Sequence, residues 1–207
     1  MAVSIRRHRR LRTEPADGVV GNERLTALTG TVLLAGFAVE GFTILSLRGL
    51  LTLHIFLGML LIGPVALKIS STVYRFARYY SGAAPYVRKG PPAPLLRVLG
   101  PFTILTSLAV LGTGVMLAVT GPGRGSWLLL HKASFILWFG VMVIHVLAYA
   151  WRLPRILLGH PEGAARVRLR GELARWLLVG AALAGGLLIA LLTIHLATPW
   201  DARLGGH

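Results

Sequence analysis

The sequence contains no cysteine and few acidic residues. Because none of the 207 residues is cysteine, disulfides, thiolate-ligated iron–sulfur clusters and cysteine nucleophiles are excluded from this chain. Only 7 residues are Asp or Glu, against 22 Lys and Arg, which gives a formal net charge of +15. A serine–histidine–acid set, a carboxylate pair and a glycine-rich phosphate loop in a credible context are also missing. These absences argue against a hydrolase, and any redox chemistry must use ligands other than sulfur.

Charged residues of both signs are scarce, and long apolar runs take their place. Hydrophobic residues make up 55% of the chain and charged residues 14%, with a mean hydropathy of +0.68, which is too apolar for a soluble domain of this size. A membrane span needs roughly 20 apolar residues, and no run shows the alternation of a barrel strand. The sequence therefore predicts an all-α integral membrane bundle with five transmembrane helices, near 25–47, 50–69, 101–120, 127–151 and 175–197.

The basic residues gather in three segments: before the first span, after the second and after the fourth. Positively charged loops stay in the cytoplasm. The pattern predicts a basic cytoplasmic arm at 1–24, a bundle at 25–197 and an outer tail at 198–207, with the N-terminus inside. The first span is longer than a signal-peptide core and is kept as a true span. We expect a multi-pass protein of the inner (cytoplasmic) membrane whose charge meets lipid headgroups and not nucleic acid.

Two histidines lie in the fourth apolar stretch, WLLLHKASFILWFGVMVIHVLAYAWR. His131 and His145 are 14 residues apart, so in a helix they lie on nearly the same face, roughly 21 Å apart. His54 lies about as far inside the second span as His131 lies inside the fourth. Because both spans run from outside to inside, we expect His54 and His131 at one depth, near the outer surface.

Neutral imidazole is a common axial ligand of haem iron. His54 and His131 are therefore predicted to bind one haem b from opposite faces. Gly58 is one turn beyond His54 and can make room for the porphyrin, while interhelical packing is the alternative reason for a glycine there. Basic residues at the outer surface are predicted to neutralise the propionates: Arg48, Arg124 and Lys132.

The inner half of the bundle is predicted to bring His145 and Lys68 to one level, since Lys68 follows His54 by 14 residues. His145 is expected to ligate a second haem, contact a quinone or only form a hydrogen bond, and these alternatives stay open. A deprotonated Lys68 can ligate a metal. The simpler interpretation is that it reaches the interface or pairs with a propionate or a lipid phosphate.

Three further residues in the predicted spans each have more than one possible role. His195, near the outer end of the fifth span, is a rival outer ligand or an interfacial residue. Glu40, in the first span, can partner a basic group, carry a proton or form an interhelical hydrogen bond. Trp138 lies between the two histidines of the fourth span, where it can line a haem, bridge two levels or pack in the core.

The spacing in the fourth span and the matched histidine in the second resemble the membrane-bound b-type cytochromes. These include the cytochrome b561-like group and the cytochrome b subunits of formate dehydrogenases and hydrogenases. The segments LKISSTVYRFARYY and LHKASFILWF also look like those of small actinobacterial membrane proteins. In the cytochromes the paired histidines of one helix serve two haems, each completed from another helix. His54 matches one of these partners, whereas the first span has no histidine to match the other.

The resemblance implies electron transfer between a quinone pool and a partner protein, through bis-histidine haem. The chain would then be an electron-transfer subunit of an oxidoreductase and not a stand-alone enzyme. The competing hypothesis is a haem-free accessory subunit of a larger complex, which the glycine-rich spans favour because small residues allow close helix contacts.

Overall fold

The computed structural model describes residues 2–91, 94–123, 125–150 and 171–204, and every element in these ranges is helical. In chain order the elements are α1 (Ala2–Leu45), α2 (Leu47–Tyr80), α3 (Ala84–Lys89), α4 (Pro94–Thr120), α5 (Trp127–Ala150), α7 (Glu172–Thr193), the 3-10 helix η1 (Ile194–Ala197) and α8 (Thr198–Leu204). The predicted all-α fold is confirmed.

Five of the helices contain segments long and apolar enough to cross a bilayer: Gly18–Leu45, Leu47–Tyr80, Pro94–Thr120, Trp127–Tyr149 and Glu172–Arg203. The number of spans predicted from hydropathy is confirmed. Helices α1, α2 and α4 are longer than the predicted spans, because apolar runs mark the hydrocarbon core whereas backbone hydrogen bonding continues into the interface. A helix of 34 residues, the length of α2, measures about 51 Å, against about 30 Å of hydrocarbon.

The prolines between the second and third spans do not all lie in extended chain. Because the residue before a proline favours extended backbone, Pro91, Pro92 and Pro94 predict an extended segment, but Pro94 is the first residue of α4. A proline is tolerated there because the first residues of a helix have no intrahelical partner for their N–H groups. Pro101, the predicted start of the span, lies inside α4. The predicted outer tail at 198–207 likewise contains a helix, α8.

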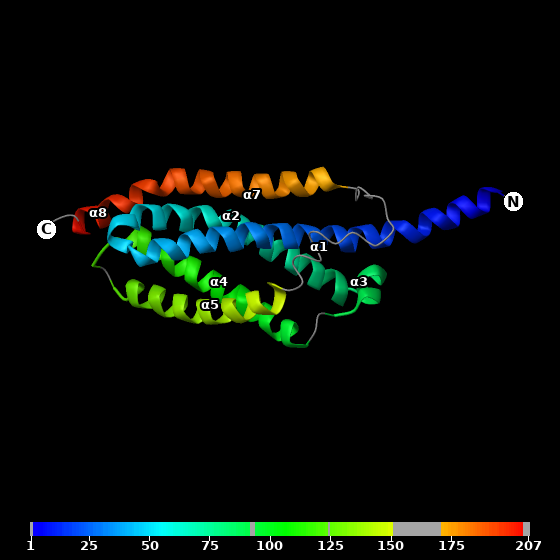
Figure 1. Cartoon of the computed structure of the whole chain (residues 1–207), viewed down its shortest axis with the longest axis horizontal. Helices are drawn as coiled ribbons and strands as arrows, with labels where there is room; N and C mark the ends of the chain where they lie inside the picture. The colour runs from blue at the N-terminus through cyan, green and yellow to red at the C-terminus, as the bar shows by residue number, and fades with distance from the viewer. Residues whose placement is uncertain (1, 92–93, 124, 151–170, 205–207) are drawn as a thin grey trace.

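Helix α2 is the centre of the bundle. It packs against α1, α4 and α7, while α4 and α5 form a closely packed pair. Figure 1 shows α7 on one side of α1 and α2 and the α4–α5 pair on the other, with α8 at the opposite end of the molecule from the start of α1. Two helical hairpins result, α1–α2 and α4–α5. The first has Ser46 as its only linking residue, whose carbonyl accepts hydrogen bonds from the N–H groups of Gly49 and Leu50.

Glycines bring α2 and α7 into backbone contact. A Cβ atom added to Gly63 would lie 2.0 Å from the carbonyl oxygen of Ala182, and one added to Gly186 would lie 2.0 Å from that of Leu60. Real Cβ atoms do not approach oxygen so closely, so these two positions need glycine. Close approach through small residues is how helices associate in a membrane, where apolar burial gives little drive.

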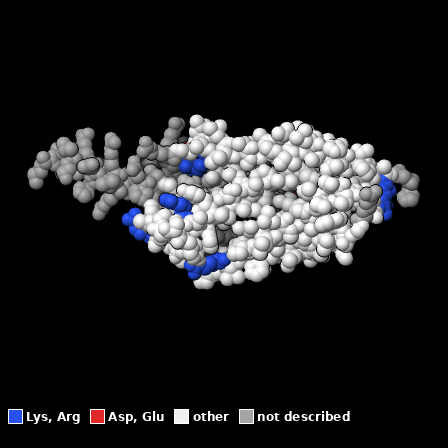
Figure 2. All heavy atoms as spheres, turned by 180° about the vertical axis from the view of Figure 1, so that it is seen from behind, with Lys and Arg blue, Asp and Glu red and all other residues white. Residues whose placement is uncertain are grey.

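The outside of the bundle is apolar along its length and basic at its ends. Figure 2 shows white atoms over the long flank and blue atoms of Lys and Arg near both ends. Large apolar side chains are open on this surface, including Phe42 (65% exposed), Ile136 (71%) and Leu147 (70%). Such a surface is stable in lipid and not in water. The chain is therefore a multi-pass membrane protein.

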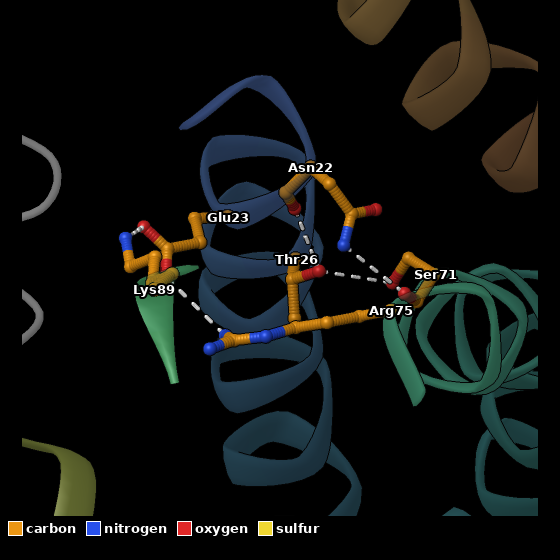
Figure 3. Close-up of polar contacts among 6 residues, drawn as sticks. All are labelled: Asn22, Glu23, Thr26, Ser71, Arg75 and Lys89. Atoms are coloured by element: carbon orange, nitrogen blue, oxygen red, sulfur yellow. Dashed lines mark hydrogen bonds and ion pairs between the residues drawn. The ribbon is translucent and has the colours of Figure 1, made fainter. Parts of the chain in front are cut away.

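Polar contacts tie α1 to α2 and α3 at the end of the bundle opposite Ser46. Glu23 pairs with Arg75, at 3.3 Å between Oε1 and a guanidinium nitrogen, and with Lys89 of α3. The amide of Asn22 donates to the carbonyl oxygen of Ser71, at 3.2 Å. Figure 3 shows Asn22 and Glu23 of α1 with their partners on the two neighbouring helices. The Glu23 carboxylate thus links α1 to both α2 and α3.

We predict that Gly186→Ala lowers the stability of the bundle, whereas Gly185→Ala does not. The Cβ at 186 meets the Leu60 backbone, which cannot move aside, while no atom lies within 4 Å of a Cβ at 185. Overpacking typically costs about 1–3 kcal/mol. Thermal unfolding of the two variants in detergent, followed by circular dichroism, measures the difference. Equal melting temperatures would contradict the α2–α7 contact.

Candidate functional site

His54 of α2 and His131 of α5 face each other across the bundle. Their ring centroids are 6.4 Å apart and the ring planes differ by 72°. Both residues are partly buried, and each lies within two turns of the end of its helix that is nearer Ser46. The structure therefore brings together the two imidazoles that the sequence placed at one depth.

The His54 ring is held from α1. Its Nδ1 lies 3.0 Å from Oε1 of Glu40 and 2.9 Å from Oγ1 of Thr43. The Thr43 hydroxyl donates its own hydrogen to the carbonyl oxygen of Glu40, so its oxygen acts as an acceptor toward His54. When Glu40 is ionised both neighbours of Nδ1 are acceptors, so Nδ1 carries the ring proton and the lone pair of the neutral ring is on Nε2.

The His131 ring is held in the same way from α4. Its Nδ1 lies 3.3 Å from Oγ1 of Thr113, and that hydroxyl donates to the carbonyl oxygen of Ala109 at 2.7 Å. Thr113 also contacts the hydroxyl of Ser134, at 2.9 Å. Because the Thr113 hydrogen is used within α4, its oxygen accepts from Nδ1–H. The Nε2 lone pair of His131 is thereby left free to bind a ligand.

Two glycines adjoin this histidine pair. A Cβ at Gly114 of α4 would lie 3.0 Å from Cε1 of His131, so the glycine lets the ring lie against the helix. A Cβ at Gly58 would lie 3.6 Å from Oε1 of Glu40. Gly58 therefore faces the carboxylate that holds His54, an arrangement that the sequence did not suggest.

The two histidines come from helices whose backbones stay apart. Among the described residues, no Cα of α5 lies within 8 Å of a Cα of α1, α2 or α7. Side chains alone bridge this region, which we call the α2–α5 seam. The seam has an imidazole on each side, and both of these side chains are partly exposed.

Trp138 closes the seam in the middle of the bundle. It is 7% exposed, and its ring lies 4.8 Å from that of Phe37 on α1, edge to face. Its indole N–H donates to the Ser107 hydroxyl on α4, at 3.1 Å. Trp138 thus joins α1, α4 and α5 and separates the outer histidine pair from the inner half.

The inner level contains His145 and Lys68. Nδ1 of His145 lies 3.5 Å from Oγ1 of Thr103 on α4, whose hydroxyl donates to the carbonyl oxygen of Leu99. The His145 ring also contacts Tyr149, with centroids 4.9 Å apart. Lys68 donates to the carbonyl oxygen of Thr26 on α1, at 2.6 Å. Lys68 and His145 are near enough for their charges to interact.

The remaining candidates are exposed or lie outside the described residues. Arg48 is exposed in the first turn of α2, close to the Ser46 turn, and Lys132 is exposed on α5. His195 is exposed in η1. Arg124 falls outside the described residues.

The hydroxyl groups that hold the imidazoles were missed by reasoning from the sequence. Thr43, Thr103 and Thr113 each bond one histidine Nδ1 while their own hydrogen goes to a carbonyl one turn back. Threonine within an apolar span usually satisfies itself in this manner, so composition alone does not mark these three. One signal could have found them. In a predicted helical hairpin, each threonine lies on one helix at the depth of its histidine on the other helix.

The donor set restricts what the site can bind. Among the described residues no group of three or more His, Asp and Glu side chains could hold a metal ion. A tetrahedral zinc site needs three or four protein ligands. Two imidazoles fit a metal whose other ligands come from its own macrocycle, as in haem. The comparisons with known proteins add no family: no protein-family model, curated protein or solved structure matches the chain.

We predict that His54 and His131 are neutral with the proton on Nδ1, and that Thr113→Val changes only the His131 signal. Valine keeps the shape of the side chain and removes the acceptor. Ring-nitrogen NMR of isotope-labelled histidine in detergent distinguishes the two tautomers. Thr120→Val is a matched control, because the Thr120 hydroxyl bonds only within α4. An Nε2–H tautomer at His54 or His131 would contradict the hydrogen-bond pattern.

Proposed function

We propose that this protein is a membrane b-type cytochrome in which His54 and His131 are the axial ligands of one haem b. The observation that carries the proposal is the 6.4 Å separation of the two rings, each with its Nδ1 engaged by a neighbouring helix. The resemblance in the second and fourth spans supports the same assignment.

The distance fits the requirement. A metal–imidazole bond measures about 2 Å, so two opposed imidazoles on one metal have ring centres roughly 6 Å apart. A simple interhelical hydrogen bond between the two rings would need one nitrogen to donate. With the tautomers that we predict, both rings carry their proton on an Nδ1 that is engaged elsewhere, so neither Nε2 has a proton to give. Direct bonding between the histidines is thus disfavoured, and a shared electrophilic partner is favoured.

The residues around the imidazoles would tune the site. Haem supplies reversible one-electron chemistry when it is bound. Glu40 and Thr43 orient the His54 ring and make its Nε2 a stronger donor, as hydrogen bonds from outside the ligand sphere do at metal sites. Thr113 does the same for His131. Trp138 and Phe37 exclude water from below the pair.

Electrons would pass between a quinone or quinol in the bilayer and a partner protein. The basic residues predict that the N-terminus is on the cytoplasmic side of the inner membrane, which puts the histidine pair near the outer surface. The sequence predicts that Arg48 and Arg124 lie at this outer surface. Their positive charges would then neutralise the haem propionates. Since no second imidazole faces His145 among the described residues, we propose one haem per chain.

The second candidate is a haem-free accessory subunit. The observation that favours it is the exposure of α5, whose backbone approaches only that of α4 among the described helices. A large apolar surface of this kind also suits a neighbouring subunit. A colourless protein that copurifies with other membrane subunits would support this candidate.

We predict that purified protein shows a reducible Soret and α band, and that His54→Ala or His131→Ala abolishes it. Each substitution removes one of the two axial donors. His195→Ala is the control, because His195 is an exposed histidine at the same end of the molecule. Visible spectra with and without dithionite, and haem content by pyridine haemochrome, measure the effect. We expect one haem per chain. Normal spectra in both alanine variants would refute the ligand assignment.

A further inference from the structure

Lys68 is a cation inside the bundle that no carboxylate neutralises among the described residues. The ion pairs found there involve Glu23 and Glu40 only. Lys68 is partly buried, and it donates a hydrogen bond to the backbone oxygen of Thr26, at 2.6 Å. An ammonium group has three N–H donors, so two remain available.

The groups that face Lys68 leave its charge uncompensated. On α1, Gly30 lies against the side chain, and a Cβ there would be 2.9 Å from Nζ. From α5, His145 interacts electrostatically with the ammonium and adds no negative charge. An unpaired charge away from water is costly, and the arrangement favours an anion over a neutral carbonyl.

The depth of Lys68 identifies the kind of anion. Lys68 follows the first residue of α2, Leu47, by 21 positions, which corresponds to about 32 Å along the helix. For a hydrocarbon core of about 30 Å that starts near Leu47, the other boundary is close to Lys68. Lipid phosphate groups would lie just beyond this boundary, within reach of the side chain.

The surroundings of that level are strongly basic. Arg75 and Arg78 follow on α2, and Arg88 and Lys89 lie on α3, which packs against α1 and α2. Glu23 is the carboxylate that pairs with Arg75 and Lys89, so Arg78 and Arg88 form no ion pair in the part of the chain that the structure describes. Basic clusters of this kind enrich anionic lipids at the adjoining leaflet.

We infer that Lys68 binds the phosphate of an anionic phospholipid at the basic end of the α2–α5 seam. The ammonium holds the phosphate oxygens with its two remaining N–H donors, and Gly30 provides the space that the side chain needs. The site is separate from the histidine pair and does not depend on haem.

The test measures lipid binding directly. The purified protein is reconstituted in phosphatidylcholine nanodiscs, and phosphatidylglycerol retention is measured by native mass spectrometry as the fraction of each lipid is varied. We expect the wild-type chain to retain phosphatidylglycerol over phosphatidylcholine, and Lys68→Gln to bind it at least about fivefold more weakly. Lys132→Gln, which removes an exposed lysine at the other end of the bundle, should leave binding unchanged.

A second pair of variants tests the geometry without removing the charge. Gly30→Ala places a methyl group 2.9 Å from Nζ, so the ammonium must shift from its position. We therefore expect this variant to weaken phosphatidylglycerol binding as Lys68→Gln does. Gly41→Ala, on the same helix with no atom within 4 Å of its Cβ, should bind normally. Circular dichroism confirms that each variant is folded.

Several outcomes would overturn the inference. The first is equal retention of the two lipids by the wild-type chain, and the second is unchanged phosphatidylglycerol binding in Lys68→Gln. The third is that Lys68→Gln loses a bound quinone while its phospholipid stays bound. The haem content of the same samples is read separately. A colourless protein that still selects phosphatidylglycerol through Lys68 would refute the cytochrome and retain the lipid site.

Discussion

The hydrogen bond between a threonine hydroxyl and a histidine Nδ1 is the interaction that holds the imidazoles of this bundle in place. It occurs at Thr43–His54 and Thr113–His131, and in a longer form at Thr103–His145. In each case the hydroxyl proton is already bonded to a carbonyl of its own helix. A polar ring within apolar surroundings would otherwise be costly. The same bond that offsets this cost also fixes the orientation of the ring.

The bundle separates its polar groups into two levels with an aromatic layer between them. The histidine pair and Glu40 are on one side of Trp138 and Phe37, and His145 and Lys68 are on the other. Such a layer keeps the cations at the basic end from the histidine pair. It also accounts for the distance of α5 from α1 and α2, because the large rings span a gap that backbone contact does not close.

Much of this arrangement follows from the sequence, and some of it does not. The five spans were predictable because an apolar run of membrane length seldom occurs outside a membrane span, and the shared depth of His54 and His131 followed from helical rise along two parallel spans. The helix ends were not, since a proline such as Pro94 usually breaks a helix and here begins α4. The partners of each imidazole also escaped prediction, because a threonine that bonds its own backbone has the same local sequence whether or not a histidine faces it. The approach of Gly63 and Gly186 to carbonyl groups of the facing helix could not be predicted, because it depends on where α2 and α7 cross.

The single-residue turn at Ser46 has a consequence for biogenesis. Thr43 and His54 are 11 positions apart, and Thr113 and His131 are 18 apart, so each imidazole and its anchor belong to one helical hairpin. Each hairpin can therefore enter the bilayer with its ring already oriented, the first before the second has been synthesised. The two halves then meet mainly through α2 and α4. A ligand bound by both rings would therefore join the hairpin that is synthesised first to the hairpin that is synthesised later.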